Sequence, residues 1–444
     1  MSDLASHESV ARKPRDVPTD SRSKAWGLTA ILVALYTVNY GDKVVLGLAA
    51  QPLREEFGFT ASQIGLAGSI FFLALTMSGL LTGVVSRWGS LKWILAALAI
   101  AWALCMLPMI FAASLAVLIV SRFLLGLFEG PSSALIHTAT YSWHPVAKRA
   151  LPGAFITSAA SISKILVAPA LGWVIVHHGW RAAFVVMSLT SVLWCAIWLT
   201  SWSPGPYGAE HDASVTDPDG TSTASPIRWI ALIKTPTFIG AALAVFSFYT
   251  LTSVILTWLP SYFEKGLGYS RLEANTMFGI PSMVALVAMF GTSFLGDRLM
   301  ARGVSSRIHR GLVPGFGLLA CGIAMVSLPY IGSPAMVVAL VSLGYGLGTI
   351  VFPLFNAAIS EICPRDKLAG TLGIFLAFMT AGGLIGPYVA GRIVDAAVNP
   401  ADGYALAFQL IGILALIGAS AAIVLVDPRR DAQKIDTLVR TATH

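Results

Sequence analysis

Charged side chains are scarce in this sequence. Only 11% of its 444 residues are Asp, Glu, Lys or Arg, whereas a soluble globular domain carries about 25%. Hydrophobic residues make up 56% of the chain, and its mean hydropathy is +0.76. The strict alternation of apolar and polar residues that marks membrane β-barrels is also missing. The composition therefore predicts an all-α, multi-pass membrane protein.

Cysteine is rare as well. The chain has four cysteines, far apart and in or beside apolar segments, at Cys105, Cys195, Cys321 and Cys363. Their spacing fits neither a metal site nor a disulfide framework, and no histidines are spaced with acids or cysteines as metal ligands. A phosphate-loop motif is absent too. We therefore expect no enzyme and no cofactor, and the sequence gives no sign that ATP is used.

An apolar leader is missing from the start of the chain. Residues 1–24 are polar and charged, so we expect no cleaved signal peptide, and the first apolar segment would direct insertion.

Apolar segments of membrane-crossing length, about 20 residues, recur twelve times. They span residues 26–50, 61–85, 92–112, 114–140, 151–176, 181–202, 236–262, 274–296, 311–330, 333–360, 369–395 and 403–426. A polar stretch rich in Asp, Ser, Thr, Gly and Pro separates the first six from the last six. The prediction is an N-terminal tail (1–25), a six-helix bundle (26–202), a linker (203–235), a second bundle (236–426) and a C-terminal tail (427–444).

Lysine and arginine concentrate on one side of this arrangement. With the N-terminus inside, the cytoplasmic tails and loops hold most of the 29 Lys and Arg residues. The external loops hold only Arg54, Arg181, Lys265 and Arg271. This asymmetry predicts that both termini are cytoplasmic. It also accounts for the net charge of +7 without nucleic-acid binding. We expect the protein to be a monomer in a cell inner membrane.

The two predicted bundles repeat each other. Residues 145–155 (PVAKRALPGAF) resemble residues 364–375 (PRDKLAGTLGIF), and residues 179–184 (GWRAAF) resemble residues 403–408 (GYALAF). Both matches fall at corresponding places in the two halves, which indicates a duplicated six-helix unit and a pseudo-symmetric pair of bundles.

The most unusual stretch is Asn39-Tyr40-Gly41-Asp42-Lys43, inside the apolar run 26–50. On insertion scales, an acid or a base at the bilayer centre costs about 2.5–3.5 kcal/mol. A charge retained at such a cost usually faces the bundle interior or a water-filled cavity. The alternative is that Asp42 and Lys43 lie near the end of the helix and snorkel to water.

Twelve segments in two related halves resemble the major facilitator superfamily over nearly the whole chain. Its hallmark loop, G-x-x-x-D-R-x-G-x-K/R, is similar to residues 83–92 (GVVSRWGSLK), where Ser86 replaces the acid. The second half has Gly296-Asp297-Arg298 at the equivalent place. The resemblance implies gating or structural roles for Arg87, Asp297 and Arg298. The missing acid at Ser86 predicts a first-half latch that is weaker or built differently.

Three segments resemble the anion:cation symporter family, which takes up sugar acids, phthalate and other organic anions. Asn39–Lys43 is similar to N-Y-x-D-R, residues 122–130 (RFLLGLFEG) to R-F-x-x-G-x-x-E, and residues 256–262 (LTWLPSY) to L-T-W-L-P-x-Y. The resemblance implies proton-coupled uptake of an organic carboxylate by alternating access. An exporter or antiporter on the same fold and a non-transporting membrane sensor are the alternatives. The helix-five pattern of drug antiporters is matched only at Pro169 and Gly172, which argues against drug export.

The resemblance assigns proton coupling to Asp42 and Glu129. Lys43 is the expected counter-charge of the substrate; it stands where Arg is usual, and it holds a carboxylate as a point charge rather than through two parallel bonds. Arg122 lies two helical turns before Glu129 on one face, and we favour a structural or gating role for it over anion binding. Lys164 leaves two alternatives open: snorkelling, or a second cation for a dianionic substrate or for Glu129.

Further candidate substrate contacts are Tyr40, Trp258 and Asn356. Aromatic residues in membrane helices more often pack or anchor, and an amide more often joins helices. A site with few amide and several aromatic side chains favours a less hydroxylated acid as the substrate. Sugar acids, aromatic acids and dicarboxylates all remain candidate substrates. The expected partners are this anion, protons and the lipid bilayer.

Overall fold

The structure, a computed structural model, describes residues 19–145, 148–207, 229–364 and 367–442. Within these ranges every element of regular secondary structure is a helix, and twelve helical segments are long and apolar enough to cross a membrane. The predicted all-α architecture and its number of membrane helices are therefore confirmed. The predicted linker lies mostly outside the described residues, as does most of the predicted N-terminal tail.

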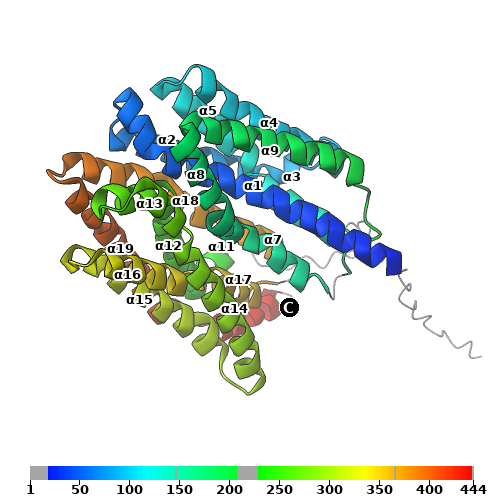
Figure 1. Cartoon of the computed structure of the whole chain (residues 1–444). Coiled ribbons are helices and arrows are strands. Elements are labelled where there is room, and N and C mark those ends of the chain that lie inside the picture. Colours follow the sequence, from blue (N-terminus) through cyan, green and yellow to red (C-terminus); the bar gives the residue numbers. More distant parts are fainter. Residues whose placement is uncertain (1–18, 146–147, 208–228, 365–366, 443–444) are drawn as a thin grey trace, which may run out of the picture.

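The first half holds the helices α1 (Thr19–Phe57), α2 (Ala61–Leu80), α3 (Thr82–Val85), α4 (Leu91–Phe111), α5 (Leu115–Glu129), α6 (Ser132–Tyr141), α7 (Ala150–Ile162), α8 (Ala168–His178) and α9 (Trp180–Ser201). The second half holds α11 (Trp229–Ile233), α12 (Pro236–Ser261), α13 (Arg271–Met277), α14 (Ile280–Ala301), α15 (Val313–Ser327), α16 (Pro334–Gly348), α17 (Val351–Ile362), α18 (Leu368–Ala396), α19 (Pro400–Leu425) and α20 (Pro428–Ala442). In Figure 1 the blue-to-green helices of the first half lie above most helices of the second.

Several membrane segments expected to be continuous are interrupted. The fourth is split into α5 and α6 at Gly130 and Pro131. The fifth contains a π-helical turn, Ser163–Val167, between α7 and α8, just before Pro169. A proline has no N–H to donate to the preceding turn, so local departures from α-geometry beside proline have a simple physical cause. Such π-turns occur often at functional sites.

Two glycines allow helices of the two halves to touch through their backbones. A Cβ atom added at Gly47 of α1 would lie 2.2 Å from the carbonyl oxygen of Leu256 in α12. At Gly65 of α2 it would lie 2.2 Å from the carbonyl oxygen of Pro387 in α18. Neither position has room for a side chain, so glycine at both sites sets how closely the halves approach.

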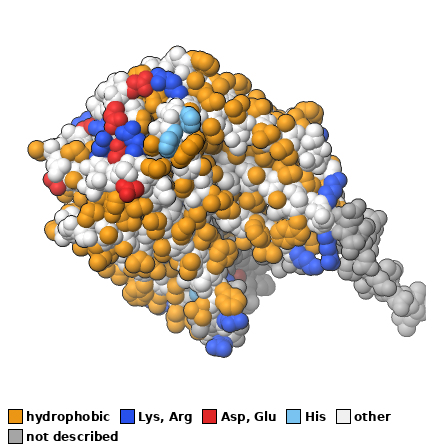
Figure 2. Space-filling view, in the orientation of Figure 1, with side chains coloured by type: hydrophobic (Ala, Val, Ile, Leu, Met, Phe, Trp, Pro, Cys, Tyr) orange, Lys and Arg blue, Asp and Glu red, His pale blue; other side chains and the backbone are white. Residues whose placement is uncertain are grey.

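The molecule has two ends, which we call the tail end, where α1 begins and α20 lies, and the loop end, where α1 ends at Phe57 and α2 begins. At the loop end Glu55 accepts hydrogen bonds from Arg271 (2.8 Å) and Lys265 (3.0 Å) of the other half. Asp395 of α18 accepts from the backbone N–H groups of Ala61 (2.8 Å) and Ser62 (2.7 Å). Figure 2 shows acidic and basic side chains gathered at one end of a largely apolar surface.

The described polar contacts between the halves are concentrated at the loop end. Deeper, the backbone N–H of Tyr388 donates to Ser69 (3.2 Å) and Gln51 donates to Tyr404 (3.0 Å). Toward the tail end, Thr76 donates to Thr380 (3.0 Å). The structure is thus a conformation closed at the loop end.

Candidate functional site

The charged motif of the first segment lies near the middle of α1 and points into the protein. Asp42 is 1% exposed, and the Lys43 side chain is 7% exposed. Neither side chain reaches the surface, so the snorkelling alternative for this pair does not describe the structure.

Lys43 is paired with the acid of the helix-four motif. Its Nζ forms an ion pair with Glu129 of α5, whose side chain is completely buried, and it donates a hydrogen bond to Oδ1 of Asn39. The Tyr40 ring lies 4.7 Å from Nζ and the Phe71 ring 5.8 Å from it. The structure therefore joins Lys43 to Glu129 in an electrically neutral pair, surrounded by an amide and two aromatic rings.

Asp42 and Arg122 lie in the same buried cluster, but their side chains do not form a hydrogen bond. Arg122 of α5 donates from Nη1 to the backbone carbonyl of Asp42 (2.8 Å), which fastens α5 to α1. The two carboxyl oxygens of Asp42 have no hydrogen-bond partner among the described residues. The two candidate proton carriers thus occupy different environments: Glu129 is paired with a cation, and Asp42 is buried without a donor.

Tyrosines from both halves face one another next to this cluster. The rings of Tyr36 and Tyr40 meet edge to face at 5.1 Å, and the Tyr36 hydroxyl donates to Ser133 of α6 (2.9 Å). Tyr249 of α12 meets the ring of Phe72 in α2 at 5.8 Å, and ring contacts through Phe352 and Phe248 join Tyr249 to Tyr345 of α16. These residues form what we call the tyrosine cluster: Tyr36, Tyr40, Tyr249 and Tyr345.

Lys164 lies on the other side of this cluster, in the π-turn between α7 and α8. It is 4% exposed, so it does not snorkel to the surface. Its Nζ donates to the hydroxyl of Tyr345 (2.9 Å) and lies 4.9 Å from the centroid of that ring. The contact joins the two halves of the protein.

Asn356 and Trp258 occupy different settings. Asn356 is half-buried in α17, one turn after Phe352, and its Oδ1 has no hydrogen-bond partner among the described residues. Trp258 is almost completely buried, and its indole N–H donates to the carbonyl of Pro387 in α18 (2.9 Å). Asn356 therefore retains an unused acceptor, whereas the only polar atom of Trp258 is already occupied in helix packing.

Of the three gating residues expected from the hallmark loops, the structure describes the side chains of Arg87 and Arg298. Arg87 is exposed, beyond the end of α3. Arg298 lies near the end of α14 with its guanidinium 4.1 Å from the ring centroid of Phe294. The backbone of Asp297 belongs to α14, and its side chain lies outside the described residues. The gating roles of these three residues stay predictions.

Sequence reasoning missed Ser133 and Tyr345. Ser133 follows Glu129 by four residues, a spacing that places both on one helix face. Tyr345 lies between two glycines, Gly344 and Gly346; such small neighbours let helices pack closely. The spacing from Glu129 and the flanking glycines are the sequence signals that could have identified Ser133 and Tyr345 as site residues.

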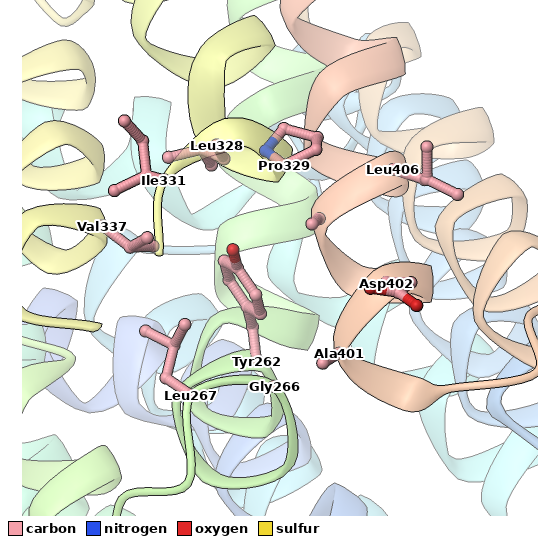
Figure 3. A pocket seen from close by; sticks show the side chains of 11 residues that line it. Tyr262, Gly266, Leu267, Leu328, Pro329, Ile331, Val337, Ala401, Asp402 and Leu406 are labelled. Carbon is pink, nitrogen blue, oxygen red and sulfur yellow. The ribbon is translucent and has the colours of Figure 1, made fainter. Parts of the chain in front are cut away.

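A cavity of about 440 Å³ lies elsewhere, at the loop end of the second half. Figure 3 shows Tyr262 in its middle, with Leu328 and Pro329 on one side and Asp402 of α19 on another. Apart from Tyr262 and Asp402, the side chains that line it are apolar. We place the candidate functional site at the tyrosine cluster instead, because buried charges of several described helices converge beside it.

Comparison with known proteins gives a consistent result. The sequence profile of the Major Facilitator Superfamily matches residues 32–350 and 303–441. A probable galactarate/D-glucarate transporter of Bacillus subtilis is 26% identical over 433 residues, which cover 91% of this chain and 92% of the relative. A hexuronate transporter of the same organism is 25% identical and covers 88% of this chain and 92% of its own length. These relatives confirm the resemblance to anion:cation symporters.

The fold is also that of a solved transporter. The crystal structure of a bacterial homolog of the human lysosomal transporter Spinster, in an inward-facing and unoccupied conformation, has a TM-score of 0.75 and 19% identity. The match covers 94% of this chain and 99% of that chain. At this identity the likeness concerns the fold alone.

Proposed function

The chain belongs to the major facilitator superfamily, and we propose that it is a proton-coupled symporter that takes up an organic carboxylate anion. It is a multi-pass membrane protein with transporters as relatives, and not an enzyme. Beyond family membership, we propose that transport is inward and that protons are the coupling ion. We also propose that the protein lies in the inner membrane and is a monomer.

The buried pair of Lys43 and Glu129 carries the proposal. A cation left alone in a low-dielectric interior is strongly unfavourable, because its lost hydration is not replaced. Lys43 therefore needs an anion at every stage of the cycle. When Glu129 takes up a proton, its charge is lost, and a substrate carboxylate replaces it as the partner of Lys43. Proton binding and anion binding thereby favour each other at one place.

Asp42 is proposed as a second proton carrier. Its carboxyl is adjacent to Lys43 in sequence and lacks a donor among the described residues, so no fixed hydrogen bond prevents it from changing protonation state. Arg122 bonds to the backbone carbonyl of Asp42, which supports a structural role: it fixes α1 against α5 while the acids titrate.

The remaining polar groups suit the organic part of the substrate. Tyr40 and Tyr36 offer hydroxyl groups and ring faces beside Lys43. The unused acceptor of Asn356 suits a hydroxyl donor on the substrate, which favours a sugar acid over an unsubstituted aromatic acid. The printed names of the two relatives, for galactarate/D-glucarate and hexuronate, support the same class.

Alternating access follows from rocking of the two halves about the tyrosine cluster. The described structure is closed at the loop end, so the proposed next step opens the contacts of Glu55 and Asp395. With the tail end cytoplasmic, as the positive-inside asymmetry predicts, a structure closed at the loop end is closed toward the outside of the cell.

Reconstituted protein tests the proposal. Liposomes are loaded at alkaline pH and diluted into acidic buffer containing radiolabelled D-galactarate, D-galacturonate or phthalate. We expect accumulation of at least one anion that collapses when the pH gradient is removed. Equal uptake with and without the gradient would contradict proton coupling. Efflux driven by inward proton movement, measured in preloaded vesicles, would instead show an antiporter.

A further inference from the structure

Lys164 is a buried cation whose charge is not neutralised by the protein. Among the described residues, no carboxylate lies within 4.0 Å of its Nζ; the partner it does have is the neutral hydroxyl of Tyr345 at 2.9 Å. Lys43, by contrast, is paired with Glu129. A phenol hydroxyl and a ring face stabilise an ammonium group less than a carboxylate does. Among the described residues, the protein therefore supplies no carboxylate to neutralise Lys164.

The Lys164 ammonium lies on the same aromatic interior as the Lys43 ammonium. The Lys164 ammonium lies over the ring of Tyr345 (4.9 Å) and the Lys43 ammonium over the ring of Tyr40 (4.7 Å). A chain of aromatic ring contacts joins the two positions. It runs from Phe71 beside Lys43 through Phe72 to Tyr249, and continues through Phe352 and Phe248 to Tyr345. The tyrosine cluster thus lies between two buried lysines that come from different helices of the first half.

The local structure holds Lys164 in this place. Its turn is π-helical, and the turn packs against the start of α14: a Cβ atom at Gly279 would lie 2.8 Å from the carbonyl of Lys164. Tyr345 is held in turn by stacking on Phe248 at 5.5 Å. Neither side chain is a mobile surface group, so the pair forms a built site and not a chance contact.

We propose that Lys164 and Tyr345 bind a second carboxylate, and that the substrate is therefore a dicarboxylate dianion with its two ends at Lys43 and Lys164. The proposal rests on the proposed function, because it uses Lys43 as the site of the first carboxylate. With Glu129 protonated, the two lysines match the two charges of the dianion. A monocarboxylate leaves Lys164 without its partner and binds more weakly.

The same arrangement explains how substrate links the halves. Lys164 belongs to the first half and Tyr345 to the second. A carboxylate that accepts hydrogen bonds from both the ammonium and the phenol hydroxyl joins the halves at the site. The second carboxylate thus contributes to selectivity.

Matched acid pairs test this inference by direct binding to purified protein. Each pair differs in one terminal carboxylate: D-galactarate with D-galactonate, and phthalate with benzoate. The measured quantity is the ratio of monoacid to diacid Kd in the wild type, in Lys164→Gln and in Lys164→Arg. We expect a ratio above about 10 in at least one pair, because one further charge-assisted contact is worth about that factor. Lys164→Gln should bring the ratio close to 1, and Lys164→Arg should largely restore it.

A purely structural role gives a different result. If Lys164 only holds the two halves together, Lys164→Gln weakens the binding of both acids of a pair equally. The ratio of their Kd values then stays unchanged, which would overturn the inference. A wild type that prefers monoacids, or that binds no diacid, would overturn it as well. Lys43→Gln separates this from the proposed function: if it leaves the affinity for both members intact, the first carboxylate site itself is wrong.

Discussion

At the scale of single residues, the proposed transport depends on which buried charges are paired. Lys43 and Glu129 neutralise each other, and Asp42 is buried without a hydrogen-bond donor among the described residues. The lysine in place of the family's usual arginine is consistent with this setting, because a compact ammonium can exchange one carboxylate for another without the fixed two-bond geometry of a guanidinium.

Replacing Lys43 by glutamine should weaken anion binding at the site. The neutral amide cannot compensate a substrate carboxylate, and we expect the Kd of the best-bound acid to rise at least about tenfold, the effect of losing one buried charge-assisted contact. Isothermal titration of the purified variant measures this. Lys434→Gln is the matched control, because Lys434 is 64% exposed and lies in α20. Equal losses in both variants would contradict the role of Lys43.

The sequence predicted the positions of some residues of the site but not their partners. The sequence motif correctly predicted that Asp42 and Lys43 lie in the protein interior, because two charges in an apolar helix are too costly to face lipid. It did not reveal that Lys43 pairs with Glu129 and that Arg122 bonds to backbone, since the rotation of α5 against α1 depends on packing of all the neighbouring helices. Trp258 matched a motif, yet its indole N–H is bound to Pro387.

At the scale of helices, two carboxylates act as caps for helices that they do not belong to. Asp395 of α18 accepts from the first N–H groups of α2 across the boundary between the halves. Asp431 of α20 accepts from the backbone N–H of Thr237 at the start of α12 (2.9 Å). The free N–H groups and the partial positive charge of a helix N-terminus favour an anion in both places.

Asp395→Asn should make the loop end open more often. Removing a carboxylate from a helix N-terminus costs about 0.3–1 kcal/mol, or up to about 2 in partly buried geometry. The closed state should lose that stability, which corresponds to an opening equilibrium raised about 2-fold to 30-fold. The measurement is the alkylation rate of Thr257→Cys, a buried position at the contact of α12 with α2, in a background without the four native cysteines. An unchanged rate would show that the cap does not hold the gate.

Asp431→Asn should loosen the attachment of α20 to α12. Burial on its own would raise the pKa of Asp431, but hydrogen bonds from Arg430 and Thr237 outweigh it and hold that pKa below its ordinary value of 3.8. Because the folded pKa is lowered, the stabilisation is complete above the unfolded pKa and is lost as the pH falls through the folded value. We expect the variant to lose about 0.5–2 kcal/mol, the range for helix caps.

Thermal unfolding in detergent, compared between pH 7 and pH 3, measures this contribution. The difference in Tm between wild type and Asp431→Asn should shrink as Asp431 is protonated. Asp436→Asn, an exposed acid on the same helix, serves as control. A difference that stays constant over this pH range would contradict the assignment.

At the scale of the whole molecule, the sequence predicted the architecture well. Hydropathy alone placed the twelve membrane segments, because each must be long and apolar to cross the bilayer. It missed the breaks at Pro131 and in the π-turn at Ser163–Val167, which depend on local backbone geometry inside an apolar run. It could not show that the loop end is closed, since the same sequence must also form the open state.

The central claim is that protonation of Glu129 and binding of a substrate carboxylate at Lys43 occur together, and Glu129→Gln tests it most directly. Glutamine has the shape of the protonated acid and cannot release a proton. The measurement compares two rates in liposomes: accumulation driven by a pH gradient, and exchange of labelled for unlabelled anion across the membrane at equal pH. The account predicts that Glu129→Gln retains exchange and loses accumulation. A variant that still accumulates anion like the wild type would contradict it.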